Sequence, residues 1–209
     1  MNRFMFVVLM LCLAFATPSF AGPSSLPENG DFETVDSSKT ARVEIRNTEL
    51  AEKLGGLYQN TNTPLIKNCD LVTFGMPAKV SIDKDVKVSG SQSVRLDCKK
   101  GEQMRLVINM PAKPMQLYKI TVWVKRTSES PDTEVILSIW SNKKSCGFTN
   151  YKNLSGATEK KNGFSKMEYV FSSKEEAEVL WFYLGACNFK LDDTLTVWFD
   201  DIKVEEVKE

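Results

Sequence analysis

The sequence of 209 residues contains no histidine. This absence excludes Ser-His-Asp and Cys-His catalysis, histidine general bases and zinc sites with histidine ligands. Chemistry based on carboxylates, Lys, Tyr or Arg stays open. No paired-carboxylate motif supports it, because Asp192-Asp193 is typical of a turn and Glu205-Glu206 of a solvated strand end. We therefore expect a protein that is not an enzyme.

The chain also lacks an excess of charge and a long apolar run. Its 27 basic residues balance 27 acidic residues, and the two kinds are interspersed. Nucleic acid requires a basic surface, so we expect no nucleic-acid partner. The one extended apolar run, Phe4 to Ala16, is too short to span a bilayer comfortably. We expect no membrane insertion.

That apolar run has the features of a secretory signal peptide covering residues 1–21. It follows the positive start Asn2-Arg3, and Ser19-Phe20-Ala21 places small residues at the two positions that signal peptidase reads. Cleavage near Ala21 would leave a short linker, residues 22–28, and one domain, residues 29–209, long enough for a sizeable core. The protein is predicted to be secreted or periplasmic.

Four cysteines follow the predicted signal peptide: Cys69, Cys98, Cys146 and Cys187. An even number in an exported chain favours two disulfides over free or metal-binding thiols, with three possible connectivities. Cys146 and Cys187 each follow an outgoing strand, and Cys98 ends a strand that comes after the irregular stretch around Cys69. We predict the bridges Cys146–Cys187 and Cys69–Cys98.

Short β-type segments separated by polar turns follow one another along the chain. They are rich in Val, Ile, Thr and aromatic residues, which favours an all-β sandwich or barrel. The clearest are Ser93–Cys98, Met104–Asn109, Tyr118–Lys125, Glu134–Trp140, Lys166–Ser172, Val179–Leu184 and Leu195–Val204. One helix is expected at Glu49–Leu54, with Asn47 or Thr48 as its cap and Gly55 at its end. Asn60–Pro64 is typical of a loop.

Alternation along three of these strands separates two faces. Tyr118, Ile120, Val122 and Val124 form a uniformly apolar set, as do Val135, Leu137 and Ile139 on the second strand and Leu180, Phe182 and Leu184 on the third. Successive side chains of a strand point to opposite faces. Trp123, Trp140 and Trp181 therefore each lie opposite an aliphatic set, and we expect them to share one open sheet face.

Four segments, in order, resemble a known family. They are Asn29-Gly30-Asp31-Phe32-Glu33, Ser89–Leu96, Tyr118–Lys125 and Trp198–Val204, and the resemblance covers roughly residues 29–206. The chain resembles the CenC-like carbohydrate-binding modules of families four, nine and twenty-two, which have a galactose-binding-like jelly roll. This resemblance implies a jelly-roll β-sandwich and non-catalytic binding of extracellular or cell-wall polysaccharide. The alternatives are an exported structural or adhesive jelly-roll protein that binds other surface proteins and, less favoured, a histidine-free polysaccharide lyase.

A sugar-binding face needs flat aromatic platforms beside polar groups. Trp123, Trp140, Trp181 and Tyr183 are the candidate platforms, and Lys125, Thr121 and Ser138 the candidate hydrogen-bonding groups. The alternative is that the long segment Ala41–Asp70 folds over this face and makes a second small core. We expect either a ligand or such a lid, because exposed apolar patches usually have one or the other.

The resemblance also implies a structural calcium ion at the edge of the sandwich. Its implied ligands are the carboxylates of Glu33 and Asp200, with carbonyl oxygens near Asp31 and Ser91. Asp200 shares strand parity with Trp198, Ile202 and Val204, so it is expected to point inward, where a carboxylate needs a cation or hydrogen-bond donors. In the alternative interpretation, Glu33 and Asp200 cap backbone amides.

Overall fold

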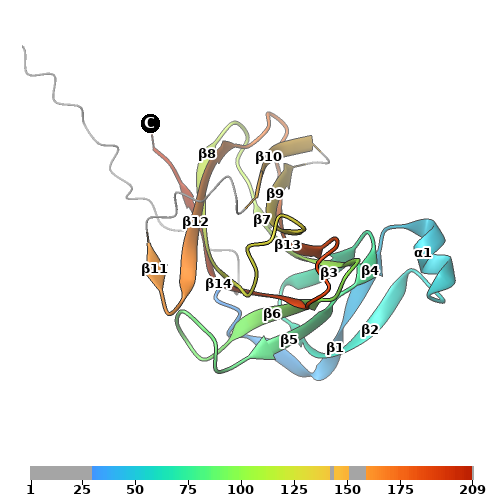
Figure 1. The fold of residues 1–209 in the computed structure, drawn as a ribbon. Coiled ribbons are helices and arrows are strands. Elements are labelled where there is room, and N and C mark those ends of the chain that lie inside the picture. The colour runs from blue at the N-terminus through green and yellow to red at the C-terminus, as the bar shows by residue number, and fades with distance from the viewer. Residues whose placement is uncertain (1–29, 142–143, 151–158, 209) are drawn as a thin grey trace, which may run out of the picture.

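The computed structural model describes residues 30–141, 144–150 and 159–208. Two β-sheets packed face to face form this part of the chain, with one short helix at the edge (Figure 1). The predicted signal peptide and linker lie outside the described residues. No helix within those residues is long and apolar enough to cross a membrane.

The first sheet has the strand order β10-β9-β13-β7-β3-β1-β2, with β4 beside β7. These strands are β1 (Val35–Ile45), β2 (Tyr58–Ile66), β3 (Cys69–Thr73), β4 (Met76–Pro77), β7 (Glu102–Pro111), β9 (Thr133–Ser141), β10 (Lys144–Asn150) and β13 (Val179–Asn188). The second sheet has the order β11-β12-β8-β14-β6-β5. Its strands are β5 (Lys79–Asp83), β6 (Ser93–Cys98), β8 (Leu117–Arg126), β11 (Lys160–Lys161), β12 (Phe164–Ser172) and β14 (Leu195–Glu206).

The main core fills the space between the sheets. Ile120, Val122 and Val124 of β8 face it from the second sheet, and Phe182 and Leu184 of β13 from the first. These are the apolar sets that alternation assigned to the core, so that prediction is confirmed. Burying a large aliphatic or aromatic side chain stabilises the fold by about 1.5–3 kcal/mol. A shift of one residue would expose the whole apolar set, so burial of this set fixes the strand register.

The helix α1 (Thr48–Lys53) is also confirmed. The Asn47 side chain caps it by accepting a hydrogen bond from Leu50 N at 2.9 Å. Gly55 follows with a φ of 84°, in the left-handed region that ends many helices. The capping residue Asn47 and the terminating Gly55 were therefore enough to predict this short helix from the sequence.

The segment Ala41–Asp70 extends the first sheet and does not fold over it. β1 pairs with β3 in parallel, and β2 pairs with β1 on the outside (Figure 1). The loop prediction for Asn60–Pro64 is wrong, because these residues lie within β2. An edge strand can be polar on both faces, so β2 carries no apolar alternation that would have revealed it.

Both predicted disulfides are wrong in this structure, where Cys69, Cys98, Cys146 and Cys187 are free. Cys187 is the register partner of Gln103 on β7 and of Glu134 on β9. The Cys98 thiol lies next to the carbonyl of Ala186, the residue before Cys187. Cys69 is the register partner of Ile108 on β7. This position is about 15 Å along the strand from the part of β7 beside which Cys98 and Cys187 lie. Cys146 lies beside Ile139 of β9, similarly far from Glu134. A disulfide needs Cα atoms within about 7 Å, so neither pair can form.

Candidate functional site

Trp140 and Trp181 lie side by side on the outer face of the first sheet. They are register partners on β9 and β13, and Tyr183 follows two residues along β13, opposite Ser138 and Val107. Their strands turn Ile139, Phe182 and related side chains into the core, so these aromatic side chains point away from it. The Trp140 side chain is 39% exposed. Three of the five predicted binding residues therefore share one open surface.

Trp123 and Lys125 lie on the opposite side of the molecule, so the prediction of a single tryptophan face is wrong. Both belong to β8 in the second sheet, together with Thr121. Trp123 packs with Val88, Phe164 and Trp198 in a second small hydrophobic cluster. Alternation shows which side of its own strand a residue occupies, but it does not show to which sheet the strand belongs.

An aromatic pocket surrounds the pair Trp140 and Trp181. Its volume is about 610 Å³, and it is lined by Arg46, Phe74, Arg105, Trp140, Trp181 and Tyr183. The Phe74 side chain is 38% exposed. We call this hollow the aromatic pocket.

Three lining residues of the aromatic pocket were missed from the sequence. Arg46 follows β1, and Phe74 lies between β3 and β4. No local pattern marks either of them. Arg105 could have been found, because it alternates with Met104 and Leu106, which face the core.

The two arginines of the aromatic pocket stack on aromatic rings. The Arg46 guanidinium carbon lies 5.9 Å from the centre of the Phe74 ring and 5.7 Å from that of Tyr183. The Arg105 guanidinium carbon lies 4.6 Å from the centre of the Phe74 ring. Such cation–π contacts contribute about 0.5–2 kcal/mol each and hold the rings in position.

Arg46 also has polar partners. Its Nη1 donates to the Tyr183 hydroxyl at 3.3 Å, and its Nη2 lies 3.2 Å from Glu44 Oε2. Partial burial by itself lowers the pKa of Arg46, but the hydrogen bonds with Glu44 and Tyr183 raise it above its ordinary value. The side chain is therefore charged and fixed in direction.

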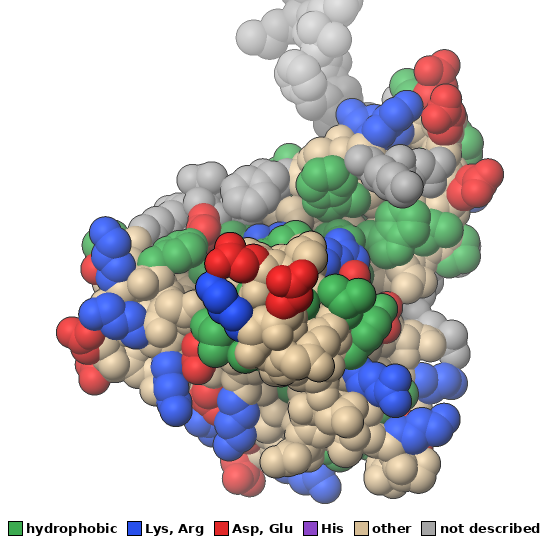
Figure 2. All heavy atoms as spheres, turned by 90° about the vertical axis from the view of Figure 1, so that its right-hand side faces the viewer, with side chains coloured by type: hydrophobic (Ala, Val, Ile, Leu, Met, Phe, Trp, Pro, Cys, Tyr) green, Lys and Arg blue, Asp and Glu red, His purple; other side chains and the backbone are tan. Residues whose placement is uncertain are grey.

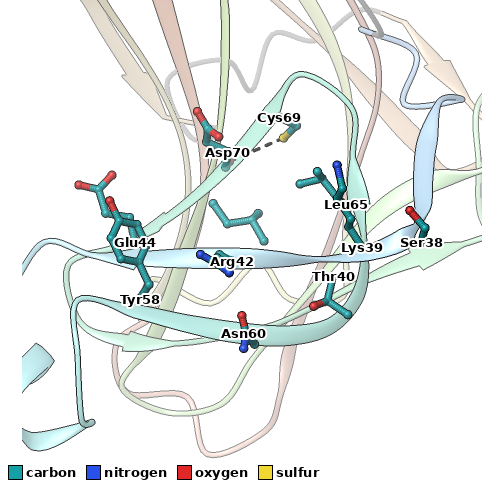
Figure 3. Close-up of a pocket in the computed structure, with 11 residues that line it drawn as sticks. Ser38, Lys39, Thr40, Arg42, Glu44, Tyr58, Asn60, Leu65, Cys69 and Asp70 are labelled. Atoms are coloured by element: carbon teal, nitrogen blue, oxygen red, sulfur yellow. Dashed lines mark hydrogen bonds between the residues drawn. The ribbon is translucent and has the colours of Figure 1, made fainter.

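A second hollow adjoins the aromatic pocket at Glu44. This polar groove has a volume of about 740 Å³ and is formed by β1, β2 and β3. Figure 3 shows Arg42 and Glu44 of β1 in this groove beside Tyr58, Asn60 and Asp70 of the neighbouring strands. The outer face of the first sheet thus offers an aromatic pocket followed by a strip of hydrogen-bonding side chains.

The predicted calcium ligands gather around the turn Val88–Gln92. Asp200 Oδ2 accepts hydrogen bonds from Val88 N at 2.7 Å and Ser89 N at 3.3 Å. Glu33 accepts from Ser91 N at 2.9 Å and Gln92 N at 3.2 Å, and also from the Ser91 hydroxyl. The two carboxylates thus cap the amides at the two ends of the turn. Asp31 is exposed and accepts a hydrogen bond from Glu33 N.

Asp200 does not share a face with Ile202 and Val204, so that part of the prediction is wrong. The register of β14 against β8 shifts after Asp200, and Asp201 has a φ of 50°. Such a bulge inserts a residue and reverses the alternation. Phe199 and Ile202 therefore face the core, and Asp200 lies under the turn Val88–Gln92.

The carboxylates of Asp200 and Glu33 differ in their electrostatics. Burial raises the pKa of Asp200, and its Oδ1 atom is buried without a hydrogen-bond partner among the described residues. Partial burial also acts to raise the pKa of Glu33, but the hydrogen bonds from Ser91 and Gln92 outweigh it and lower the pKa. The cost of burying the Asp200 carboxylate is therefore not offset by a hydrogen bond to Oδ1 from any described residue.

Comparison of the sequence with protein families and with curated proteins finds no match. Solved structures do resemble the chain. The enzymatically active domain of tailspike protein 4 from Bacteriophage CBA120 is 14% identical, with a TM-score of 0.50 over 68% of this chain and 20% of that chain. This chain therefore spans a fifth of that tailspike chain.

Two further solved structures have lower scores. The CBM22-1 xylan-binding domain from Paenibacillus barcinonensis is 12% identical, with a TM-score of 0.43 over 63% of this chain and 83% of that chain. A Stig cyclase from Fischerella sp. TAU is 13% identical, with a TM-score of 0.48 over 88% of this chain and 98% of that chain. At such identities the likeness is one of fold. The predicted jelly-roll β-sandwich is confirmed.

Proposed function

We propose that this chain is an exported, non-catalytic module that binds extracellular or cell-wall polysaccharide on the outer face of its first sheet. The observation that carries the proposal is the aromatic pocket, in which Trp140, Trp181, Tyr183 and Phe74 line one open hollow. A pyranose ring presents an apolar face of C–H groups that packs on flat aromatic rings. Those rings lose little conformational entropy on binding. Export rests on the signal-peptide pattern of residues 1–21.

The arrangement of the segment Ala41–Asp70 supports a free binding face. Within the described part of the chain, this segment lengthens the sheet at its edge, and Trp140 remains 39% exposed. Figure 2 views the molecule from the side that carries α1 and shows hydrophobic side chains gathered there between projecting charged ones. Large exposed apolar areas on a protein usually have a binding partner.

The polar groups of the aromatic pocket favour binding over catalysis. Among the described residues, no carboxylate lines it, and neighbouring Glu44 forms an ion pair with Arg46. A lyase would need a base placed at the sugar ring with a pKa suited to proton abstraction. Arg46, Arg105 and Tyr183 supply hydrogen-bond donors instead, and donors of this kind orient sugar hydroxyl groups.

Affinity electrophoresis in native gels that contain one polysaccharide each tests the proposal. We expect at least one plant, algal or bacterial cell-wall polysaccharide to retard the protein. Trp181→Ala should abolish the retardation, because it removes the central platform of the aromatic pocket. Phe189→Ala is the matched control, since it removes an aromatic side chain that is 54% exposed outside the pocket.

Two outcomes would contradict the proposal. The first is the absence of retardation in every polysaccharide gel. The second is the appearance of new reducing ends or unsaturated products during incubation, which would make the protein an enzyme.

We also propose a structural calcium ion beside Asp200. Its Oδ1 is buried and has no hydrogen-bond partner in the part of the chain that the structure describes, so it fits a cation, and calcium prefers carboxylate and carbonyl oxygens. The remaining ligands would have to be mostly carbonyl oxygens, because the described residues contain no cluster of three or more His, Cys, Asp or Glu side chains. The ion would neutralise the buried carboxylate and stabilise the turn Val88–Gln92.

A further inference from the structure

The two arginines of the aromatic pocket differ in how their hydrogen-bonding groups are satisfied. Arg46 donates to Tyr183 and forms an ion pair with Glu44. Arg105 stacks on the Phe74 ring, and its Nε atom is buried with no hydrogen-bond partner among the described residues. A buried donor on a charged group that lacks a partner is costly. Arg105 is also one of the residues that line the aromatic pocket, so its charged group lies at the wall where a ligand would bind.

The charge of the aromatic pocket is also unbalanced. Its lining includes two guanidinium groups and, among the described residues, no carboxylate. Glu44, just outside, offsets the charge of Arg46. Both guanidinium carbons lie within 6 Å of the centre of the same Phe74 ring. Within the described part of the chain, the positive charge of Arg105 therefore remains without an opposing carboxylate in a largely aromatic hollow.

We propose, on the basis of the function proposed above, that the polysaccharide is acidic and contains uronic acid. Pyranose rings of the polymer would pack on the aromatic rings of the pocket, and the carboxylate of one of them would accept hydrogen bonds from Arg105. A planar carboxylate matches the fork of a guanidinium group, whereas a sugar hydroxyl would leave the positive charge unpaired. Arg105 thus selects for the acid group, and the aromatic rings bind the sugar rings.

Matched pairs of polymers test this selectivity. Polygalacturonate, alginate and hyaluronan are each compared with their carboxyl-reduced, neutral form by isothermal titration calorimetry of the unmodified protein. We expect one acidic polymer to bind at least about tenfold more tightly than its neutral form, a difference of about 1.4 kcal/mol. This preference should weaken as the salt concentration rises, because salt screens the ion pair.

Variants identify the arginine responsible. Arg105→Gln should lower the affinity for the acidic polymer by at least about tenfold more than it lowers the affinity for the neutral form. Lys160→Gln is the control, since it removes the same charge from exposed β11 in the second sheet. Should Arg105→Gln fail to fold, the comparison of acidic and neutral polymers with the unmodified protein still decides the question.

The outcomes separate this inference from the function on which it rests. Equal binding of acidic and neutral forms would overturn the acidic preference and leave polysaccharide binding intact. Equally tight binding of a polymer that carries sulfate groups and no carboxylate would overturn the assignment to a carboxylate. Failure to bind any polysaccharide would overturn the proposed function itself.

Discussion

The four tryptophans of the chain form two pairs with opposite surroundings. Trp140 and Trp181 lie in the aromatic pocket on the outer face of the first sheet, and Trp140 is 39% exposed. Trp123 and Trp198 lie on the outer face of the second sheet, are each 7% exposed, and pack against Val88 and Phe164. In the sequence, Trp123, Trp140 and Trp181 occupy equivalent positions opposite an aliphatic set. The difference in the exposure of these tryptophans therefore comes from the segments that pack on the outer face of each sheet.

The cover of the second sheet is held by specific polar contacts. Asp200 and Glu33 accept hydrogen bonds from backbone amides of the turn Val88–Gln92. Trp198 Nε1 donates to Asp83 Oδ2 at 2.8 Å, so the buried indole group is satisfied. A buried polar group needs such a partner. The second pair is therefore core, and the first pair is available to a ligand.

The largest expected effect comes from Trp123→Ala. This change empties the centre of the small cluster on the second sheet and should lower the free energy of unfolding by about 3–5 kcal/mol. Trp140→Ala, on the partly exposed face, should lower it by about 1 kcal/mol or less. Urea denaturation followed by far-UV circular dichroism compares the two variants. Equal losses of stability would break the distinction between the two pairs.

A smaller loss is expected from Gly90→Ala in the covering turn. Gly90 has a φ of 59°, and a Cβ atom there would collide with the Glu33 carboxylate. The strained backbone and the disturbed cap should together lower stability by about 1–3 kcal/mol. Gly101→Ala is the control, because it has a φ of 81° with open space around its Cβ position. If both variants lose the same free energy of unfolding, the contact between the turn and Glu33 does not stabilise the cover of the second sheet.

Calcium should have the smallest effect on the covered side. At a free calcium concentration about five times its Kd, binding to the native state adds about 1 kcal/mol to stability. Chelation should therefore lower the Tm of the unmodified protein and leave that of Asp200→Asn unchanged. A Tm that does not respond to chelator or to added calcium would rule out the ion. Asp200 and Glu33 would then serve only as caps of backbone amides.

The elements with strong local signals could be predicted from the sequence. β6 begins and ends as expected, and Asn47 caps α1. The alternating strands β8, β9 and β13 present the expected side chains to the core. In each case the information lies within about ten neighbouring residues, where period and capping determine the structure.

The parts that failed depend on contacts between distant segments. No local pattern tells that β8 joins the second sheet while β9 and β13 join the first, so Trp123 was grouped with the wrong partners. The bulge after Asp200 reverses alternation without a sequence signal such as glycine. Disulfide pairing failed for the same reason, since strand ends do not define register.

The resonances of the tryptophan indole N–H groups test the account most directly. The four tryptophans should give four such signals in a ¹⁵N–¹H spectrum, assigned by single Trp→Phe substitutions. During titration with a polysaccharide that retards the protein, the signals of Trp140 and Trp181 should shift, and those of Trp123 and Trp198 should stay in place. Shifts confined to Trp123 and Trp198, or no shift of Trp140 and Trp181 at saturation, would contradict binding on the outer face of the first sheet.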